Sequence, residues 1–393
     1  MIDLRKKIIF SIIASVTIIS FSNAANAESI DYRQYAHGIS FVENPAANEN
    51  YLVWSDAFKK GIAKDGSWTH DVYRMKINMD DPKVKKVKRI IKANEAQEPA
   101  SSSCTNDGNM IVTFEDGNDA GDYELCQRFA IYDKRMHKVK KYPATIAMGG
   151  HSGHAASTSD HHIVFWCDGW IDGGGVDDLG TGDDLYVTSM DSDGENEKTI
   201  PVAESDKTRD WWPVLSASDS EALLVWQRYL NNEEVSSLCM AMYNPADNKL
   251  KTMSVNEKVK YYMYNAVYLK NLQLFAVNAV AENNRGILLL IDNNGNIIKK
   301  IDDLEPFVRE ASPAVEILAN GVNLYYPADK SDVQKISIST DLIIKSSVHQ
   351  IDYTWADCGT AGFVDNNKKV WFAALNVKNF KKHKKTLSLV PMN

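Results

Sequence analysis

The side chains best suited to chemistry in this 393-residue chain are two histidines, a tyrosine and an arginine that lie far apart in the sequence. A histidine can serve as a general base near neutral pH, a tyrosine can donate a proton, and an arginine can bind the charge of an acidic substrate. We therefore predict catalytic roles for His151, His154, Tyr264 and Arg309. The alternative for the histidines is a structural role with satisfied hydrogen bonds.

A second set of residues offers aromatic faces and carboxylates, which suits a sugar. Apolar sugar faces stack on rings, while carboxylates and a guanidinium bind hydroxyls or an acidic group. The predicted ligand-binding set is His37, Trp211, Trp212, Tyr262, Glu310, Trp355 and Asp357. The alternative is that these side chains only pack against one another and close the channel. Trp211 and Trp212 in particular could belong to the hydrophobic core.

The segment 167–184 could bind a metal ion, because it holds six aspartates and six glycines in eighteen residues. Aspartates supply hard oxygen ligands, so Ca²⁺ is the expected ion. The predicted ligands are Asp168, Asp172, Asp177, Asp178, Asp183 and Asp184. Their spacing matches no EF-hand loop, and the alternative is a solvated loop. Asp191–Asn196 also looks like a calcium loop, but its register favours a hairpin turn.

The elements that must position these residues are indicated by an aromatic residue that recurs about every 50 residues within short β-type runs. The recurring aromatics are Trp54, Phe114, Trp166, Trp226, Phe275, Tyr325 and Trp371. Each is expected on the second strand of a four-stranded antiparallel meander, and turns rich in Asn, Asp and Gly separate the strands. A ring that wedges between two sheets is expected to be core, contributing about 2–3 kcal/mol by burial.

This pattern predicts an all-β fold, a seven-bladed β-propeller whose ring is closed by the N-terminal segment 29–35. The chain resembles secreted β-propellers in general. In such a ring the first strands line a central channel, and the loops entering them share one face. That arrangement would gather the predicted catalytic and ligand-binding residues at one mouth. His161 and His162 are expected at the far end of the strand from His151 and His154, so one metal ion cannot bind both pairs.

The N-terminus predicts export. Arg5, Lys6 and Lys7 precede the apolar run Ile8–Phe21, and Ala25-Asn26-Ala27 offers a cleavage site, so residues 1–27 read as a signal peptide and residues 28–393 as one propeller domain. We expect a periplasmic or extracellular monomer without a membrane span. The net charge of −8 argues against a nucleic-acid partner. The five cysteines, an odd number, allow either buried free thiols or one disulfide.

Two functions fit these observations. The first is an exported propeller that binds, or binds and cleaves, an oligosaccharide or similar small polar ligand at the channel mouth. The second is a non-catalytic scaffold of the cell envelope, such as an assembly factor or toxin inhibitor, whose partner is an envelope protein. The sequence contains no G-x-S-x-G elbow, no P-loop and no H-E-x-x-H motif, so the common hydrolase, nucleotide-binding and zinc-protease motifs are missing.

Overall fold

The computed structural model describes residues 36–57, 69–121, 123, 125–169, 183–205, 208–229, 235–356, 359–375 and 387–392. These residues form strands, turns and irregular segments, with no helix among them, and all belong to one compact unit. The all-β prediction is therefore confirmed for this part of the chain. No described helix is long and apolar enough to cross a bilayer.

The first three sheets are four-stranded antiparallel meanders in chain order. The first contains β1 (Ala36–Asn44), β2 (Glu49–Asp56), β3 (Asp71–Ile77) and β4 (Lys88–Ile91). The second contains β5 (Gln97–Cys104), β6 (Met110–Asp116), β7 (Cys126–Tyr132) and β8 (Lys138–Met148). The third contains β9 (His151–Ser157), β10 (His161–Cys167), β11 (Leu185–Asp191) and β12 (Lys198–Ala203).

The next eight strands form two further meanders that are joined at one edge. One contains β13 (Arg209–Ala217), β14 (Ala222–Tyr229), β15 (Val235–Asn244) and β16 (Lys249–Met253). The other contains β17 (Lys258–Leu269), β18 (Leu274–Ala281), β19 (Gly286–Asp292) and β20 (Ile297–Leu304). The first residues of β15 pair with the first residues of β17, which makes one continuous sheet.

The last two sheets complete the unit. One is the meander β22 (Ala314–Leu318), β23 (Gly321–Ala328), β24 (Asp332–Ser339) and β25 (Ile344–Gln350). The other joins β26 (Thr360–Val364), β27 (Val370–Leu375) and β28 (Leu387–Pro391) to the two-residue strand β21 (Ala311–Ser312), which runs parallel to β26. The segment 29–35, predicted to close the ring, lies outside the described residues, so its role stays a prediction.

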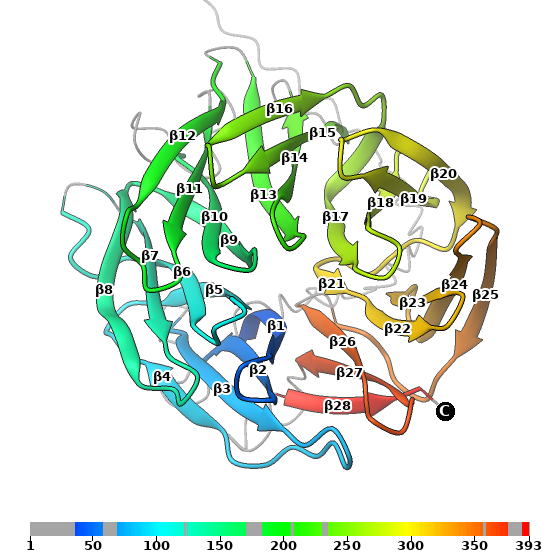
Figure 1. Cartoon of the computed structure of the whole chain (residues 1–393), viewed down its shortest axis with the longest axis horizontal. Coiled ribbons are helices and arrows are strands. Elements are labelled where there is room, and N and C mark those ends of the chain that lie inside the picture. Colours follow the sequence, from blue (N-terminus) through cyan, green and yellow to red (C-terminus); the bar gives the residue numbers. More distant parts are fainter. Residues whose placement is uncertain are drawn as a thin grey trace, which may run out of the picture. The chain divides into compact units, whose positions relative to one another are not determined.

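The innermost strands surround a common centre, as Figure 1 shows. Each contacts the next in chain order from β1 through β5, β9, β13 and β17 to β21, then β26, and β26 returns to contact β1. This is a propeller-type arrangement. It brings the first residues of strands that are distant in the sequence to the same end of the centre.

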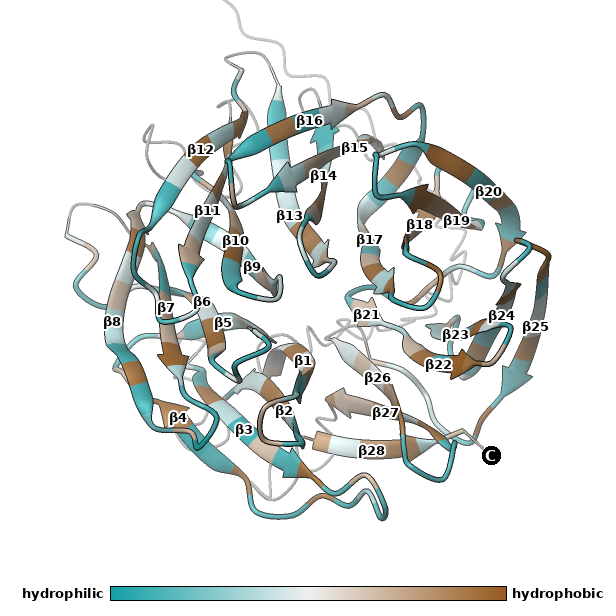
Figure 2. Cartoon of the chain, in the orientation of Figure 1, coloured by the Kyte–Doolittle hydropathy of each residue, from teal (hydrophilic) through white to brown (hydrophobic). Residues whose placement is uncertain are grey.

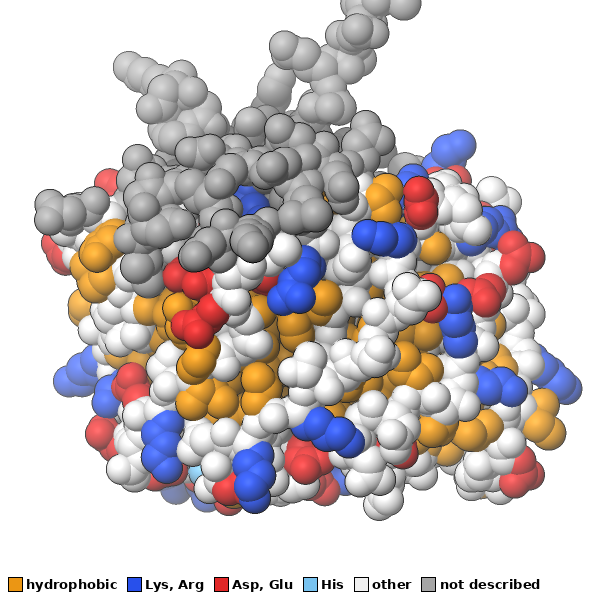
Figure 3. All heavy atoms as spheres, turned by 90° about the horizontal axis from the view of Figure 1, so that it is seen from above, with side chains coloured by type: hydrophobic (Ala, Val, Ile, Leu, Met, Phe, Trp, Pro, Cys, Tyr) orange, Lys and Arg blue, Asp and Glu red, His pale blue; other side chains and the backbone are white. Residues whose placement is uncertain are grey.

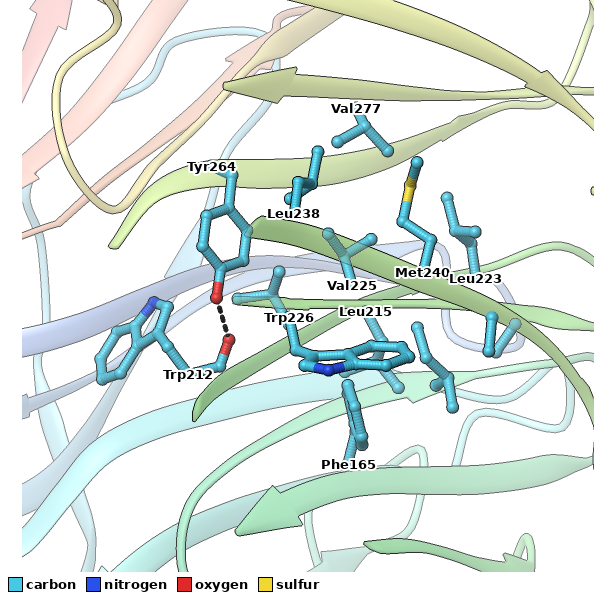
Figure 4. Close-up of a cluster of buried hydrophobic side chains, with 14 of the residues drawn as sticks. Phe165, Trp212, Leu215, Leu223, Val225, Trp226, Leu238, Met240, Tyr264 and Val277 are labelled. Carbon is cyan, nitrogen blue, oxygen red and sulfur yellow. Dashed lines mark hydrogen bonds between the residues drawn. The ribbon is translucent and has the colours of Figure 1, made fainter. Parts of the chain in front are cut away.

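The recurring aromatics lie on the second strands, as predicted, and hold neighbouring sheets together. Trp54, Phe114, Trp166, Trp226, Phe275 and Tyr325 are buried, whereas Trp371 is half-buried. Phe165 meets Trp226 of the next sheet edge-on at 6.1 Å between ring centres, and Figure 4 shows this pair within a shared apolar cluster. Between the last and first sheets, Phe363 stacks on Phe41 at 5.0 Å. The recurring aromatic residues therefore contribute to the hydrophobic packing between sheets.

Burial changes outward along each sheet. The middle strand β18 is buried over almost its whole length, while the outer strand β25 is mostly exposed. Figure 2 shows the corresponding change from largely hydrophobic middle strands to outer strands of mixed hydropathy. Cys104, Cys126, Cys167 and Cys239 are free thiols, and Cys358 lies outside the described residues.

Replacing Trp226 by alanine should lower the free energy of unfolding by about 3–5 kcal/mol, because the substitution leaves a cavity between two sheets. It also removes the indole hydrogen bond to Asp210 Oδ1 at 2.6 Å. The matched control is Trp371→Ala, the same deletion at a half-buried position, which should cost clearly less. Urea unfolding of both variants measures the difference, and equal losses would contradict the assignment of Trp226 to the core between the sheets.

Candidate functional site

A backbone irregularity recurs where the inner strands begin. Gly38, Ser152, Trp212, Tyr262 and Glu310 all have positive φ, with values of 64°, 53°, 53°, 59° and 54°. The first four coincide with a shift in strand register, which marks a β-bulge, and Glu310 directly precedes β21. A bulge re-aims the side chains beside it. Positive φ is unfavourable for bulky residues such as Trp212 and Tyr262, so the surrounding structure must hold them there.

Side chains from the preceding sheet hold these bulges. The amide of Ser152 donates to Glu115 Oε1, and the next amide, of Gly153, donates to Gln127 Oε1 at 2.8 Å. The amide of Tyr262 donates to Gln227 Oε1 at 3.1 Å. Backbone groups displaced from the strand ladder therefore find partners in the neighbouring sheet, which offsets part of the strain.

The bulges place four side chains in a continuous row. The ring of His154 meets Trp212 at 5.4 Å, and Trp212 meets Tyr262 edge-on at 4.8 Å. The guanidinium of Arg309 lies over the face of Tyr262 at 4.3 Å, a cation–π contact. These residues come from β9, β13, β17 and the segment before β21. His154 and Tyr262 are half-buried, and the Arg309 side chain is 15% exposed.

Glu310 completes this end of the row. Its Oε1 accepts a hydrogen bond from Arg309 Nε at 3.2 Å, the one ion pair of Arg309 among the described residues. The guanidinium is therefore fixed by a ring below and a carboxylate at its side. Its two terminal nitrogens are geometrically suited to a bidentate contact with a carboxylate.

A second, deeper layer supports the row. Trp211 donates its indole N–H to Tyr262 Oη at 3.0 Å and packs against His151 at 4.6 Å. The guanidinium of Arg209 lies 3.8 Å from the centre of the Trp211 ring and is ion-paired with buried Asp183. A Cβ atom on Gly169 would lie 2.3 Å from His151 Nε2, so only glycine fits that position without a shift. Trp211, His151 and Arg209 of this layer are all buried.

The two histidines of the predicted catalytic set occupy different environments. His151 is only 1% exposed, and burial together with the charge of nearby Arg209 lowers its pKa to about 3, so it is neutral at physiological pH and lies out of reach of a substrate. His154 lies at the half-buried row, and its Nδ1 is 3.0 Å from the carbonyl of Ser152. Because a carbonyl only accepts, Nδ1 carries the hydrogen, and Nε2 of the neutral ring has the lone pair that a base needs.

Tyr264 is buried beneath the row. Its hydroxyl donates to the carbonyl of Trp212 at 2.6 Å, as Figure 4 shows, and lies 3.2 Å from the carbonyl of Trp211. The contact anchors the bulge that carries Trp212. The structure thus gives Tyr264 a positioning contact, with its hydroxyl directed to the backbone.

The structure brings together eight of the predicted catalytic and ligand-binding residues in these two layers: His151, His154, Trp211, Trp212, Tyr262, Tyr264, Arg309 and Glu310. Trp355 is not among them. It packs edge-on against Phe372 at 5.3 Å in another apolar cluster and donates its indole N–H to the carbonyl of Asp332. The side chain of His37 and all of Asp357 lie outside the described residues.

Three of the six predicted calcium ligands are described, and each anchors backbone or an arginine. Asp168 Oδ1 accepts from the amide of Asp184, and Asp184 Oδ1 accepts from the amide of Ser205. Asp183 is paired with Arg209, a cation already in place. The described ranges contain no group of three or more potential metal ligands. Asp172, Asp177 and Asp178 lie outside them, so calcium binding stays a prediction. Asp191–Asn196 forms the predicted hairpin turn, with the Gly194 amide bonded to the Asp191 carbonyl.

Sequence reasoning missed two residues of the site, Arg209 and Glu115. Glu115 directly follows the recurring aromatic Phe114, as Gln227 follows Trp226, and both accept an amide from the next inner strand. Aligning the repeats one residue beyond the aromatic would have revealed this shared position. Arg209 lies two residues before Trp211, but no pattern in the sequence indicates that it stacks on that ring.

Comparison with known proteins gives structural likenesses only. No protein-family model and no curated protein sequence matches this chain. Among solved structures, a prolyl endopeptidase aligns at 12% identity and a TM-score of 0.47, covering 92% of this chain and 51% of its own. An α-L-arabinofuranosidase from Fusarium graminearum, complexed with an iminosugar inhibitor, aligns at 9% identity and a TM-score of 0.48. The alignment covers 82% of this chain and 94% of the arabinofuranosidase. The Aleuria aurantia lectin, in complex with Fucα1-6GlcNAc, aligns at 10% identity and a TM-score of 0.41. The alignment covers 75% of this chain and 94% of the lectin. This chain thus spans about half the length of the endopeptidase, and at these scores none of the likenesses bears on function.

The second histidine pair lies at the other end of β9 and β10, as predicted. His162 pairs with Ser157 in the strand ladder, whereas Cys167, at the far end of β10, pairs with His151. His162 is fully buried between Ser157 Oγ at 2.8 Å and the carbonyl of Ser192 at 3.1 Å. Burial lowers its pKa to about 4, so it is neutral in the folded protein.

We expect this histidine to destabilise the protein in acid. Its pKa is about 6.5 when unfolded, so between pH 6.5 and about 4 the unfolded chain binds a proton that the folded chain does not. The contribution of His162 to the free energy of unfolding is fully present above pH 6.5. As the pH falls from 6.5 to about 4, the free energy of unfolding decreases by about 1.4 kcal/mol per pH unit. His162→Gln should flatten the slope measured by urea unfolding, whereas His137→Gln, an exposed histidine, should not. A slope unchanged in His162→Gln would refute the assignment.

Proposed function

We propose that this chain binds an acidic oligosaccharide at the mouth of its central channel. The observation that carries the proposal is the row His154–Trp212–Tyr262–Arg309, to which β9, β13, β17 and the segment before β21 each contribute one side chain. Arg309 would bind the acidic group, and the half-buried Tyr262 would contact the apolar face of the sugar ring, while the buried Trp212 holds Tyr262 in place. His154 Nε2 would accept a hydrogen bond from a sugar hydroxyl.

The wider setting of this proposal is a propeller of seven blades, closed by the segment 29–35 against the outer edge of β28, in an exported monomer. The succession of meanders and the return contact of β26 to β1 support the ring. The N-terminal composition supports export.

A small ligand fits the row better than a protein partner does. Trp212 is only 7% exposed and Arg309 15%, so a flat protein surface would touch little of either. A small ligand can bind through a few side chains, whereas a stable protein interface needs about 800 Å² of surface on each partner. The alternative of a non-catalytic envelope scaffold would need binding through other surfaces, and it predicts that substitutions in the row leave partner binding unchanged.

Binding to a panel of acidic and neutral oligosaccharides, measured by calorimetry, tests the proposal. We expect Arg309→Gln to weaken binding of the acidic members about 10- to 100-fold, since a charge-assisted contact is worth about 1.5–3 kcal/mol. The control is Arg285→Gln, an exposed arginine paired with Asp303 at the edge of β19. If no member binds, or if both variants bind equally well, the proposal fails.

The same panel tests cleavage. Release of reducing ends or unsaturated uronates that disappears in His154→Gln would assign His154 as the base. The control is His137→Gln, which removes an exposed histidine in the β7–β8 turn. If the unchanged protein binds a member of the panel but releases no products, the protein only binds the oligosaccharide and His154 has no catalytic role.

A further inference from the structure

Among the residues that the structure describes, basic side chains are concentrated in two short segments, 82–92 and 134–141. Together these nineteen residues contain eleven of the 44 lysines and arginines in the chain and no aspartate or glutamate. The chain as a whole carries a net charge of −8, so the remaining residues are strongly acidic. Such an asymmetry creates a local positive potential that can attract a polyanion.

The fold brings the two segments together at the rim. The first contains β4 and the second leads into β8, which are the outer strands of the first and second sheets and lie next to each other in Figure 1. Tyr132, at the end of β7, donates its hydroxyl to the carbonyl of Ile90 in β4 at 3.1 Å. Ile90, Ile91 and Met136 pack in one apolar cluster beneath. We call the basic side chains around this contact the basic rim.

Most charges of the basic rim are not neutralised by the protein. Lys83 pairs with Asp81, Arg89 with Asp71 and Lys140 with Glu195. The other eight make no ion pair with any described residue, and all eight are exposed: Lys85, Lys86, Lys88, Lys92, Lys134, Arg135, Lys138 and Lys141. Eight cations without an ion pair therefore face solvent, and the acidic residues next to the two segments in the sequence are Asp80, Asp81 and Asp133.

Protection of sheet edges does not explain this concentration. Lysines on an outer strand discourage edge-to-edge pairing, and every outer strand needs that protection. Yet β12 and β25 have one lysine each, and the two lysines of β20 are followed by two aspartates. Figure 3 views the rim from the side of β12 and β16, where basic and acidic side chains are interspersed. β16 has two lysines, but Lys249 is ion-paired with Asp247 and Lys251 donates to the carbonyl of Asn294. Among the described outer strands, basic side chains without an ion pair are most numerous in and beside β4 and β8.

We propose that the basic rim is a docking surface for a linear polyanionic glycan, a chain bearing carboxylates or sulfates. A strip of uncompensated cations across two sheets matches the repeated charge of such a polymer. A membrane surface fits less well, because stable attachment needs apolar side chains to insert. Val139 is the one large apolar residue within the two segments that is exposed, at 41%.

The basic rim lies at the opposite end of the sheets from the channel mouth. Strand direction alternates, so the turns between third and fourth strands lie at the end where inner strands finish. Consistent with this, a Cβ atom on Gly108, in the turn after β5, would lie 2.8 Å from Cβ of Lys134. The basic rim is therefore a separate surface, and the inference does not rest on the proposed function of the mouth.

The experiment measures binding of the whole exported protein to heparin and polygalacturonate, with neutral dextran as the uncharged chain. We expect binding that weakens steeply with salt and is absent for dextran. Combined replacement of Lys86, Lys88, Lys138 and Lys141 by serine should weaken it about fourfold or more, since four exposed contacts between a cation and the polyanion are lost. The matched control replaces Lys299, Lys330, Lys345 and Lys368, which are equally exposed and change the net charge equally.

Two further probes decide the partner class. Vesicles containing phosphatidylglycerol and a single-stranded oligonucleotide are tested under the same salt conditions. Tighter binding of either than of both glycans, an equal loss in the control variant, or no glycan binding at all would overturn the proposal. Arg309→Gln should bind the polyanions as the unchanged protein does, so a failure at the mouth and a failure at the basic rim give different results.

Discussion

The structure depends on hydrogen bonds that pass from the second strand of one sheet to the inner strand of the next. Ser55 Oγ donates to the carbonyl of Gln97, and Cys167 Sγ lies 3.7 Å from the carbonyl of Asp210. Glu115 and Gln227 accept amides of Ser152 and Tyr262. Apolar packing between sheets is non-directional and would tolerate sliding. These polar contacts fix the relative height of neighbouring sheets, and so determine which residues meet at the centre.

The same contacts explain how bulky residues can occupy unfavourable backbone conformations. An inner strand with regular pairing would turn alternate side chains away from the centre. The bulges at Trp212 and Tyr262 break that alternation, at a cost of about 1–3 kcal/mol each. Gln227 and Tyr264 offset part of the cost by binding the displaced backbone groups. The strained bulges and the polar contacts between sheets therefore depend on each other, because those contacts keep the backbone in its unfavourable conformation.

This coupling also marks the limit of what the sequence reveals. The recurring aromatics predict the meanders, because a buried ring every 50 residues leaves a periodic trace. The turn at Asp191–Asn196 is predicted because Asn, Asp and Gly stabilise it locally. A bulge at Trp212 leaves no such trace, because positive φ at a tryptophan is imposed by tertiary contacts. Trp355 shows the converse: an aromatic residue expected at the mouth packs instead in another apolar cluster, since one aromatic residue does not reveal which way it points.

Positively charged side chains occupy two different environments in the described part of the chain. In the row, Arg309 is held by the ring of Tyr262 and the carboxylate of Glu310, and in the buried layer beneath, Arg209 is held by Trp211 and Asp183. Such preorganised charges suit a short ligand that must adopt one orientation. At the basic rim eight cations are exposed and make no ion pair with a described residue, which suits a polymer that can bind in many registers. A long anionic chain held at the rim would raise the local concentration of its free ends near the protein without occupying the mouth.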